Sequence, residues 1–193
     1  MSDKTPSLGR YSARDRVIDE LLILSVLAGE QQAIDRLGRR WNTRLLRVAM
    51  HITGDRELAE IATQEAWVGI CRNWRKLKDP TKFSAWAFGI LRRKCFDAVR
   101  HKARGRRQVE NMLAEPRISH PARGELQIEL SQAFDILSAP HRTVAILYFA
   151  EELTLAEIAA ALDRPLGTIQ SRIHYARRKL QAALSEENGE NNE

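Results

Sequence analysis

Residues 153–180 read LTLAEIAAALDRPLGTIQSRIHYARRKL, a segment that predicts two helices joined by a tight turn. Thr154 comes just before the first helix and Glu157 follows three residues later, which is the pattern of a capping box. The turn Asp163-Arg164-Pro165 ends the first helix, and Gly167-Thr168 begins the second. The inward faces are predicted to consist of Ile158, Ala159, Leu162, Ile169, Ile173 and Ala176. Small Ala159 would let the two helices cross closely.

The outward face of the second helix carries hydrogen-bond donors suited to DNA. In a helix-turn-helix the second helix enters the major groove, where Arg and Gln side chains read base edges in pairs of hydrogen bonds. Hydroxyl groups and free helix N–H groups suit phosphate oxygens. The candidate contacts are Thr168, Gln170, Ser171, Arg172, His174, Arg177 and Arg178. The plainer alternative is a helical hairpin whose basic face is only solvated.

Helical periodicity continues toward the N-terminus, and no clean alternating strand pattern interrupts it. Helices are predicted over 12–28, 31–53, 55–74 and from about 82 to 99. Gly54 should end the second of these and Asp55 should cap the third. In the first, the predicted inward stripe is Val17, Leu21, Leu24 and Ala28. Four helices of this length predict one bundle with a single core.

The composition changes between the two helical blocks. Residues 102–124 contain glycines, two prolines and several arginines without an apolar stripe, so a flexible linker is expected there. Residues 125–184 form the second block, in which Leu126, Leu130, Phe134 and Leu137 share one face and Pro140 starts a helix. The polar tail after residue 184 is expected to be disordered. The fold class predicted is therefore all-α, with helical domains at 12–101 and 125–184.

A second basic region lies at the end of the fourth helix and the start of the linker. Its cations are Arg92, Arg93, Lys94, Arg100, Lys102, Arg104, Arg106 and Arg107. Phe83, Trp86 and Phe88 lie nearby, and cations with aromatic rings suit melted DNA, which offers both phosphates and unstacked bases. Core packing is the alternative for the aromatics and is favoured for Trp86 and Phe88. For the basic residues, phosphate contact is favoured over a merely solvated face.

Composition excludes several other classes. The chain has 193 residues with a formal charge of +6, is 44% hydrophobic, and has two cysteines outside any CxxC pair. No signal peptide or membrane span is visible, so a cytoplasmic location is expected. No catalytic motif, metal-ligand spacing or phosphate-binding glycine loop is present, and the five histidines are scattered. A non-enzymatic protein without metal or cofactor is expected.

Three segments together resemble a known family. GTIQSRIHYARRKL (167–180), DRELAEIATQEAW (55–67) and FSAWAFGILRRKCFDAVR (83–100) are similar to bacterial RNA polymerase sigma factors of the extracytoplasmic-function (ECF) subfamily of the sigma-70 family. The resemblance covers about 24–184. It implies an N-terminal domain that binds core polymerase and the promoter −10 element, and a C-terminal domain that binds the −35 element.

Roles for particular residues follow from the resemblance alone. The outward residues of 168–178 named above would meet the −35 element. The −10 strand would meet the loop 76–82 and the helix after it, through Lys78, Lys82, Phe83, Trp86, Arg92, Arg93 and Arg100. The clamp of the largest polymerase subunit would meet Glu60, Ile61, Gln64, Glu65 and Trp67. Further partners implied are the flap of the second-largest subunit and an anti-sigma factor.

The sequence departs from the family pattern at several of these positions. Ile61 stands where an acid is usual, Gln170 replaces the more usual Lys, and His174-Tyr175 stand where small or basic residues are common. The promoter sequence therefore cannot be borrowed from relatives.

Three other interpretations stay open at this point. The first is a stand-alone helix-turn-helix regulator, which would have no need of the clamp-docking segment 55–67. The second is a nucleic-acid enzyme or RNA-binding module, against which the missing catalytic groups and the missing sheet argue. The third is a decoy that keeps the sigma shape only to bind protein, and the basic helix faces argue against it.

Overall fold

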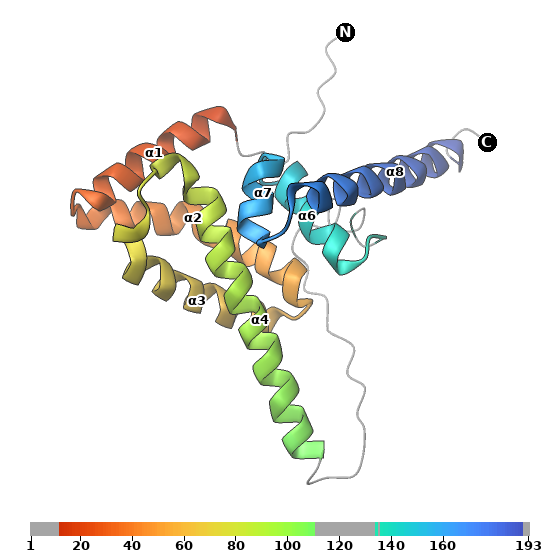
Figure 1. The fold of residues 1–193 in the computed structure, drawn as a ribbon, viewed down its shortest axis with the longest axis horizontal. Coiled ribbons are helices and arrows are strands. Elements are labelled where there is room, and N and C mark those ends of the chain that lie inside the picture. The colour runs from red at the N-terminus through yellow and green to blue at the C-terminus, as the bar shows by residue number, and fades with distance from the viewer. Residues whose placement is uncertain (1–11, 111–133, 135, 191–193) are drawn as a thin grey trace.

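The computed structural model describes residues 12–110, 134 and 136–190, and its regular elements in these ranges are all helices. In chain order they are α1 (Ala13–Leu27), α2 (Gln31–Thr53), α3 (Arg56–Asn73), the 3₁₀ turns η1 (Trp74–Lys76) and η2 (Pro80–Lys82), α4 (Phe83–Glu110), α6 (Ala139–Phe149), α7 (Leu155–Leu162) and α8 (Leu166–Glu190). Helices α1–α4 form an N-terminal lobe and α6–α8 a C-terminal lobe (Figure 1). The prediction of an all-α fold is confirmed.

Capping residues set the limits of the first three helices. The Ser12 hydroxyl accepts a hydrogen bond from the Asp15 N–H, and the Asp15 carboxylate accepts one from the Ser12 N–H in return. Gly54 ends α2 with φ 65°, a left-handed conformation that glycine adopts without strain. Asp55 then accepts a hydrogen bond from the Leu58 N–H at 3.2 Å and starts α3. The predicted limits of these helices are confirmed closely.

An aromatic cluster forms the centre of the N-terminal lobe. The Trp41 ring of α2 is fully buried, and its centre lies 4.7 Å from that of Phe83 and 5.6 Å from that of Phe88 on α4. The Trp41 indole N–H donates to the Asp19 carboxylate of α1 at 2.8 Å. A buried tryptophan N–H needs such an acceptor, so this bond fixes α1 against α2.

The buried face of α1 differs from the predicted one. Val17 is 54% exposed, Leu21 60% and Leu24 52%, although all three belong to the predicted inward stripe. Asp19, Ile23 and Val26 face inward instead. The segment Leu21–Leu27 is apolar on several sides, so periodicity alone does not select the inward side. The hydrogen bonds that Trp41 and Arg40 donate to Asp19 select it.

The C-terminal lobe forms around α6. Pro140 lies in the first turn of α6, as predicted, and Val144 and Leu147 are buried with Ile169 and Ile173 of α8. Phe134 and Leu137 are buried as well. Leu126 and Leu130, which were predicted for the same face, lie outside the described residues.

Two segments that were predicted to lack regular structure are helical. Helix α4 continues to Glu110, into the predicted linker 102–124, and α8 continues to Glu190, into the predicted disordered tail. Residues 102–110 are mostly good helix formers, and their single glycine costs only about 1 kcal/mol in a helix. Extending a helix that has already formed adds one hydrogen bond per residue fixed. Residues 111–124 of the predicted linker lie outside the described part of the chain.

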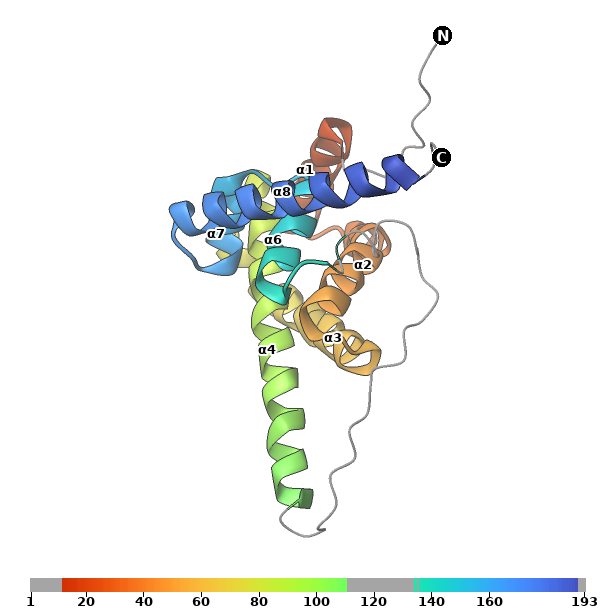
Figure 2. The same ribbon diagram turned by 90° about the vertical axis from the view of Figure 1, so that its right-hand side faces the viewer.

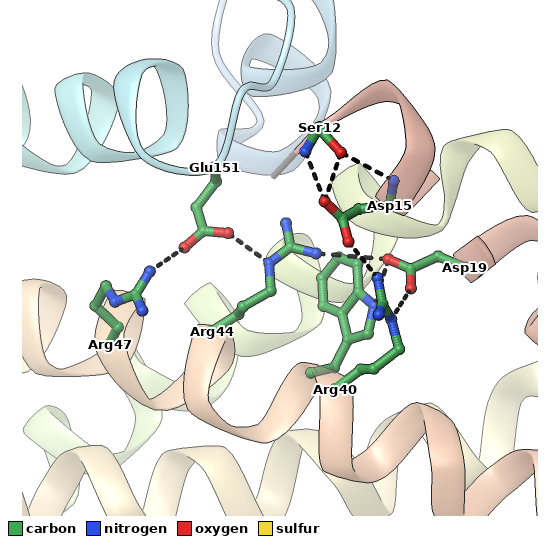
Figure 3. A network of polar contacts seen from close by, with 8 residues as sticks. Ser12, Asp15, Asp19, Arg40, Arg44, Arg47 and Glu151 are labelled. Carbon is green, nitrogen blue, oxygen red and sulfur yellow. Dashed lines mark hydrogen bonds and ion pairs between the residues drawn. The ribbon is translucent and has the colours of Figure 1, made fainter. Parts of the chain in front are cut away.

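The two lobes lie against each other. Figure 2 shows α7 beside the first half of α4, and α6 also contacts α2. The buried Glu151 carboxylate, from the loop between α6 and α7, accepts a hydrogen bond from Arg44 Nε of α2 at 2.7 Å and lies 3.4 Å from a terminal nitrogen of Arg47 (Figure 3). Arg44 also lies 3.6 Å from Asp19 of its own lobe. The prediction of two helical domains gave no indication of this contact.

Candidate nucleic-acid interface

Local signals position the helix-turn-helix as predicted. The Glu157 N–H donates to the Thr154 hydroxyl at 3.2 Å, and the Glu157 carboxylate accepts from the Thr154 N–H at 2.7 Å, which starts α7. Asp163 ends α7 with φ 50°, and only Asp163 to Pro165 separate α7 from α8. On α8, Ile169 and Ile173 are buried. The opposite sides of α8 are therefore directed to solvent.

The predicted −35 contacts all lie on these outer sides of α8. Gln170, Ser171, His174, Arg177 and Arg178 are exposed, and Thr168 and Arg172 are half-buried. Two of these side chains already have partners within the lobe. The Ser171 hydroxyl donates to the Thr168 carbonyl at 3.0 Å, and Arg177 donates to the Tyr148 hydroxyl of α6 at 2.9 Å.

His141 and Tyr175 belong to this surface although sequence reasoning did not assign them to it. Their ring centres are 4.4 Å apart, and a 2.7 Å hydrogen bond joins His141 Nδ1 to the Ser138 hydroxyl. Burial, together with the charge of Arg172, lowers the pKa of His141. The neutral imidazole keeps one donor and one acceptor. His141 is far from α8 in sequence, so only the folded lobe brings it to this cluster.

The basic region of α4 is partly neutralised. Arg93 and Arg100 are exposed, whereas Lys94 is 3.1 Å from the Glu65 carboxylate and Lys102 pairs with Asp55. Arg92 is half-buried, with its guanidinium carbon 5.3 Å from the centre of the exposed Phe96 ring. Burial, and then the charge of Arg164, lower the pKa of Arg92. Phe96 is thus an exposed aromatic beside a cation, and sequence reasoning did not single it out.

The predicted −10 residues in and just after the loop before α4 differ in exposure. Lys78 and Lys82 are exposed, and Trp86 is half-buried with its ring centre 6.3 Å from that of Trp74. Phe83 is only 2% exposed, because its ring lies between those of Trp41 and Trp74. The prediction that Phe83 contacts DNA is therefore wrong for this conformation. Phe83 is a core residue that packs against the rings of Trp41 and Trp74.

The predicted polymerase-docking residues share one side of α3. Glu60, Gln64 and Glu65 are exposed, and Ile61 is 45% exposed. Val68, which sequence reasoning did not list, adds an apolar side chain that is 42% exposed. Trp67 is half-buried and donates to the Asn42 side chain of α2 at 3.1 Å. Apolar side chains rimmed by polar ones mark protein-binding surfaces when they form a large patch, and Ile61 and Val68 supply two such side chains among carboxylates on this side of α3.

No group of three or more His, Cys, Asp or Glu side chains with metal-binding geometry occurs among the residues that the structure describes. None of the helices it describes has the length and apolar character needed to cross a membrane.

Comparison with known proteins supports the two-part organisation. The model of sigma-70 region 2 matches residues 31–105, and the model of sigma-70 region 4 matches residues 133–182. The first of these ranges covers α2, α3 and most of α4, and the second covers α6, α7 and most of α8.

Similar proteins span most of the chain. The ECF RNA polymerase sigma factor SigE of Mycolicibacterium smegmatis is 31% identical over 174 residues, which are 84% of this chain and 66% of SigE. SigL of Mycobacterium tuberculosis is 31% identical over 148 residues, 74% of this chain and 83% of SigL. SigW of Bacillus subtilis is 27% identical over 178 residues, 84% of this chain and 94% of SigW.

Two solved structures are similar in fold. The sigma factor RpoE, in complex with the anti-sigma factor NepR from Bartonella quintana, has a TM-score of 0.61 and 25% identity and covers 78% of this chain and 96% of its own. CnrH, in complex with the cytosolic domain of CnrY, has a TM-score of 0.59 and 22% identity and covers 87% of this chain and 97% of its own. Sequence, domain order and fold agree, and the chain belongs to the ECF RNA polymerase sigma factors.

Proposed function

We propose that each lobe binds a different promoter element while the N-terminal lobe also binds core polymerase. In this assignment the outer sides of α8 bind the −35 element, and α4 with the preceding loop binds the −10 strand. The exposed side of α3 docks on the polymerase clamp, and the C-terminal lobe reaches the flap. The observation that carries the proposal is the exposure of both surfaces, one basic on α8 and one mixed apolar and acidic on α3.

The mechanism we propose is binding without catalysis. Phosphate neutralisation by arginine and lysine supplies affinity that is independent of sequence and falls with salt. Base contacts from α8 add about 1–3 kcal/mol of discrimination for each good bidentate pair. Flipped −10 bases captured against α4 would offset the cost of unstacking. Because core polymerase transcribes the chromosome, we propose that this protein acts in the cytoplasm.

Family membership favours this function over a stand-alone regulator. A regulator needs no polymerase-docking surface, whereas α3 presents Ile61 and Val68 to solvent among carboxylates. We also propose control by an anti-sigma factor that covers the polymerase-facing surfaces. The similar RpoE was solved in complex with an anti-sigma factor, which supports this.

Two variants separate the proposed surfaces. Arg172→Ala should lower promoter-specific transcription by about 5- to 150-fold, since one base contact is worth about 1–3 kcal/mol, and should leave core binding intact. The double variant Gln64→Ala/Glu65→Ala should weaken core binding and leave binding of −35 DNA intact. Among the residues that the structure describes, Glu65 pairs with Lys94 at the surface, so its loss should cost little stability.

The measurements are in-vitro transcription with core enzyme, core binding by co-purification, and thermal unfolding followed by circular dichroism. Arg39→Ala, an exposed cation on α2 outside both surfaces, is the matched control for Arg172→Ala. If Arg172→Ala lost core binding while keeping the wild-type melting temperature, α8 would be misassigned. Wild-type protein that neither bound core enzyme nor started transcripts would refute the proposed function as a whole.

A further inference from the structure

Two helices of the C-terminal lobe bring polar side chains together beside the proposed −35 surface. Helix α6 packs against α8 (Figure 2), and His141, in the first turn of α6, faces Tyr175 of α8. The centres of the two rings are 4.4 Å apart and their planes are inclined by 39°. Tyr175 is 43% exposed, so this ring pair lies at the surface of the lobe.

Arg172 is the third member of this cluster. It precedes Tyr175 by three residues, so the two side chains lie on the same side of α8. Its charge reaches the imidazole, since burial and then Arg172 lower the pKa of His141. A cation of α8 and a hydrogen-bonding ring of α6 are therefore adjacent, on a side of α8 that we assign to DNA.

The Ser138 hydroxyl determines how the imidazole can be used. Ser138 is the N-cap residue of α6, a position where a serine hydroxyl usually accepts a hydrogen bond from the helix backbone. Here the hydroxyl makes no capping bond and lies 2.7 Å from Nδ1 of His141. When the hydroxyl donates to Nδ1 of a neutral imidazole, Nε2 carries the proton. Nε2 is then a donor for a ligand.

The location of His141 suits the DNA backbone more than a base edge. In helix-turn-helix proteins the recognition helix enters the major groove, while a neighbouring helix crosses the backbone. His141 belongs to α6, so its side chain would lie at the edge of the groove that α8 enters. Phosphate oxygens accept hydrogen bonds there from the N–H and O–H groups of many side chains.

We propose that His141 binds a backbone phosphate of the −35 element by donating a hydrogen bond from Nε2. Tyr175 holds the plane of the ring, Ser138 sets which nitrogen carries the proton, and the charge of Arg172 adds to the attraction for the phosphate. This inference rests on the proposed function, because it adds a residue of α6 to the −35 surface that the proposed function assigns to α8.

Replacing His141 by phenylalanine separates a DNA contact from packing. His141→Phe keeps an aromatic ring against Tyr175 and removes both ring nitrogens, so the melting temperature should stay near that of wild type. Because a hydrogen bond to a charged group is lost, the dissociation constant for DNA should rise by about tenfold or more. Fluorescence anisotropy measures it with full-length protein and a labelled duplex that carries the −35 element of a promoter identified by in-vitro transcription.

Two controls accompany this variant. His101→Phe makes the same change at an exposed histidine of α4 and should leave the dissociation constant for this duplex unchanged. A second duplex, of unrelated sequence, separates a phosphate contact from a base contact. His141→Phe should weaken binding to both duplexes by a similar factor, since phosphates carry no sequence information.

A second pair of variants does not depend on how phenylalanine packs. His141→Gln keeps an N–H donor without the ring, whereas His141→Leu has no donor and is of similar size. We expect the glutamine variant to bind both duplexes more tightly than the leucine variant. Equal affinities at equal melting temperatures would contradict a contact through Nε2.

Ser138→Ala tests the positioning role of the hydroxyl. Because this hydroxyl makes no capping bond, its loss should leave the melting temperature near that of wild type. It should raise the dissociation constant in the wild-type background but not in the His141→Phe background, where no ring nitrogen remains to be oriented. Equal effects in the two backgrounds would refute this role of Ser138.

Two further results would overturn the proposal. One is wild-type affinity of His141→Phe for the −35 duplex, because packing against Tyr175 would then be the whole role of the ring. The other is a loss confined to the promoter duplex, which would indicate a base contact in place of a phosphate contact. If wild-type protein itself did not distinguish the −35 duplex from unrelated DNA, the proposed −35 assignment would fail, so the two failures are distinguishable.

Discussion

Replacing Asp19 by alanine tests how the N-terminal lobe stabilises its buried charges. Asp19 is 3% exposed, accepts hydrogen bonds at 2.8 Å from both Trp41 and Arg40, and lies 3.6 Å from Arg44. Breaking a buried ion pair by removing one partner costs about 3–5 kcal/mol, because the other charge stays buried. The Arg40 arm is one-third exposed and adds little. Since Arg44 keeps Glu151, we expect the lower end, about 3 kcal/mol.

Equilibrium unfolding in urea, followed by tryptophan fluorescence, measures this loss. Asp19→Asn keeps an acceptor for the Trp41 N–H and should cost less, about 1–2 kcal/mol. The control Asp35→Ala removes an exposed carboxylate of α2 and should stay within about 0.5 kcal/mol of wild type. A loss below about 1 kcal/mol for Asp19→Ala, with an unchanged m-value, would refute the claim that this carboxylate stabilises the buried cation.

Three further predictions follow from the N-terminal lobe. Leu24→Ser should change the unfolding free energy by less than about 0.5 kcal/mol, whereas Ile23→Ala, one residue away and fully buried, should lower it by about 2–5 kcal/mol. Equal losses in urea unfolding would favour the inward face of α1 that the sequence predicts. Gly38→Ala should raise the melting temperature, because the added Cβ meets nothing within 4 Å and alanine favours helix. Gly69→Ala should raise the melting temperature less or lower it, because the added Cβ would lie 3.1 Å from a side chain of α4. The reverse order of the two melting temperatures would contradict the packing of α3 on α4. Hydrogen bonds from Ser12 and then Arg40 lower the pKa of Asp15 to about 2. The stabilising contribution of Asp15 is therefore complete above its unfolded-state pKa of about 3.9 and is lost as the pH falls toward 2. Asp15→Asn should flatten that part of the plot of unfolding free energy against pH, and an unchanged slope there would contradict the prediction.

Local signals account for what could be predicted of the fold. The Thr154 and Glu157 capping box, the left-handed Gly54 and Pro140 in the first turn of α6 each act within a few residues, so the sequence alone determines them. The outward side of α8 was predictable for the same reason, since Ile169 and its apolar neighbours define the opposite side.

Long-range packing accounts for what could not be predicted. The inward side of α1 depends on a hydrogen bond to Trp41, which comes from a different helix. Phe83 follows a basic loop, which favoured a DNA contact, but the bundle core holds it. Glu151 was an acid in a loop with no distinguishing pattern. Its partner Arg44 is 107 residues away in sequence, so only the folded chain shows that the two meet.

The double pairing of Arg44 has an evolutionary consequence. A substitution that shifts α2, for example at Trp41, would alter both the core of the N-terminal lobe and the ion pair between Arg44 and Glu151 of the C-terminal lobe. The stability of the N-terminal lobe and the contact between the lobes therefore depend on the same arginine. A lineage that repacked the bundle around Trp41 would also change how its two lobes meet.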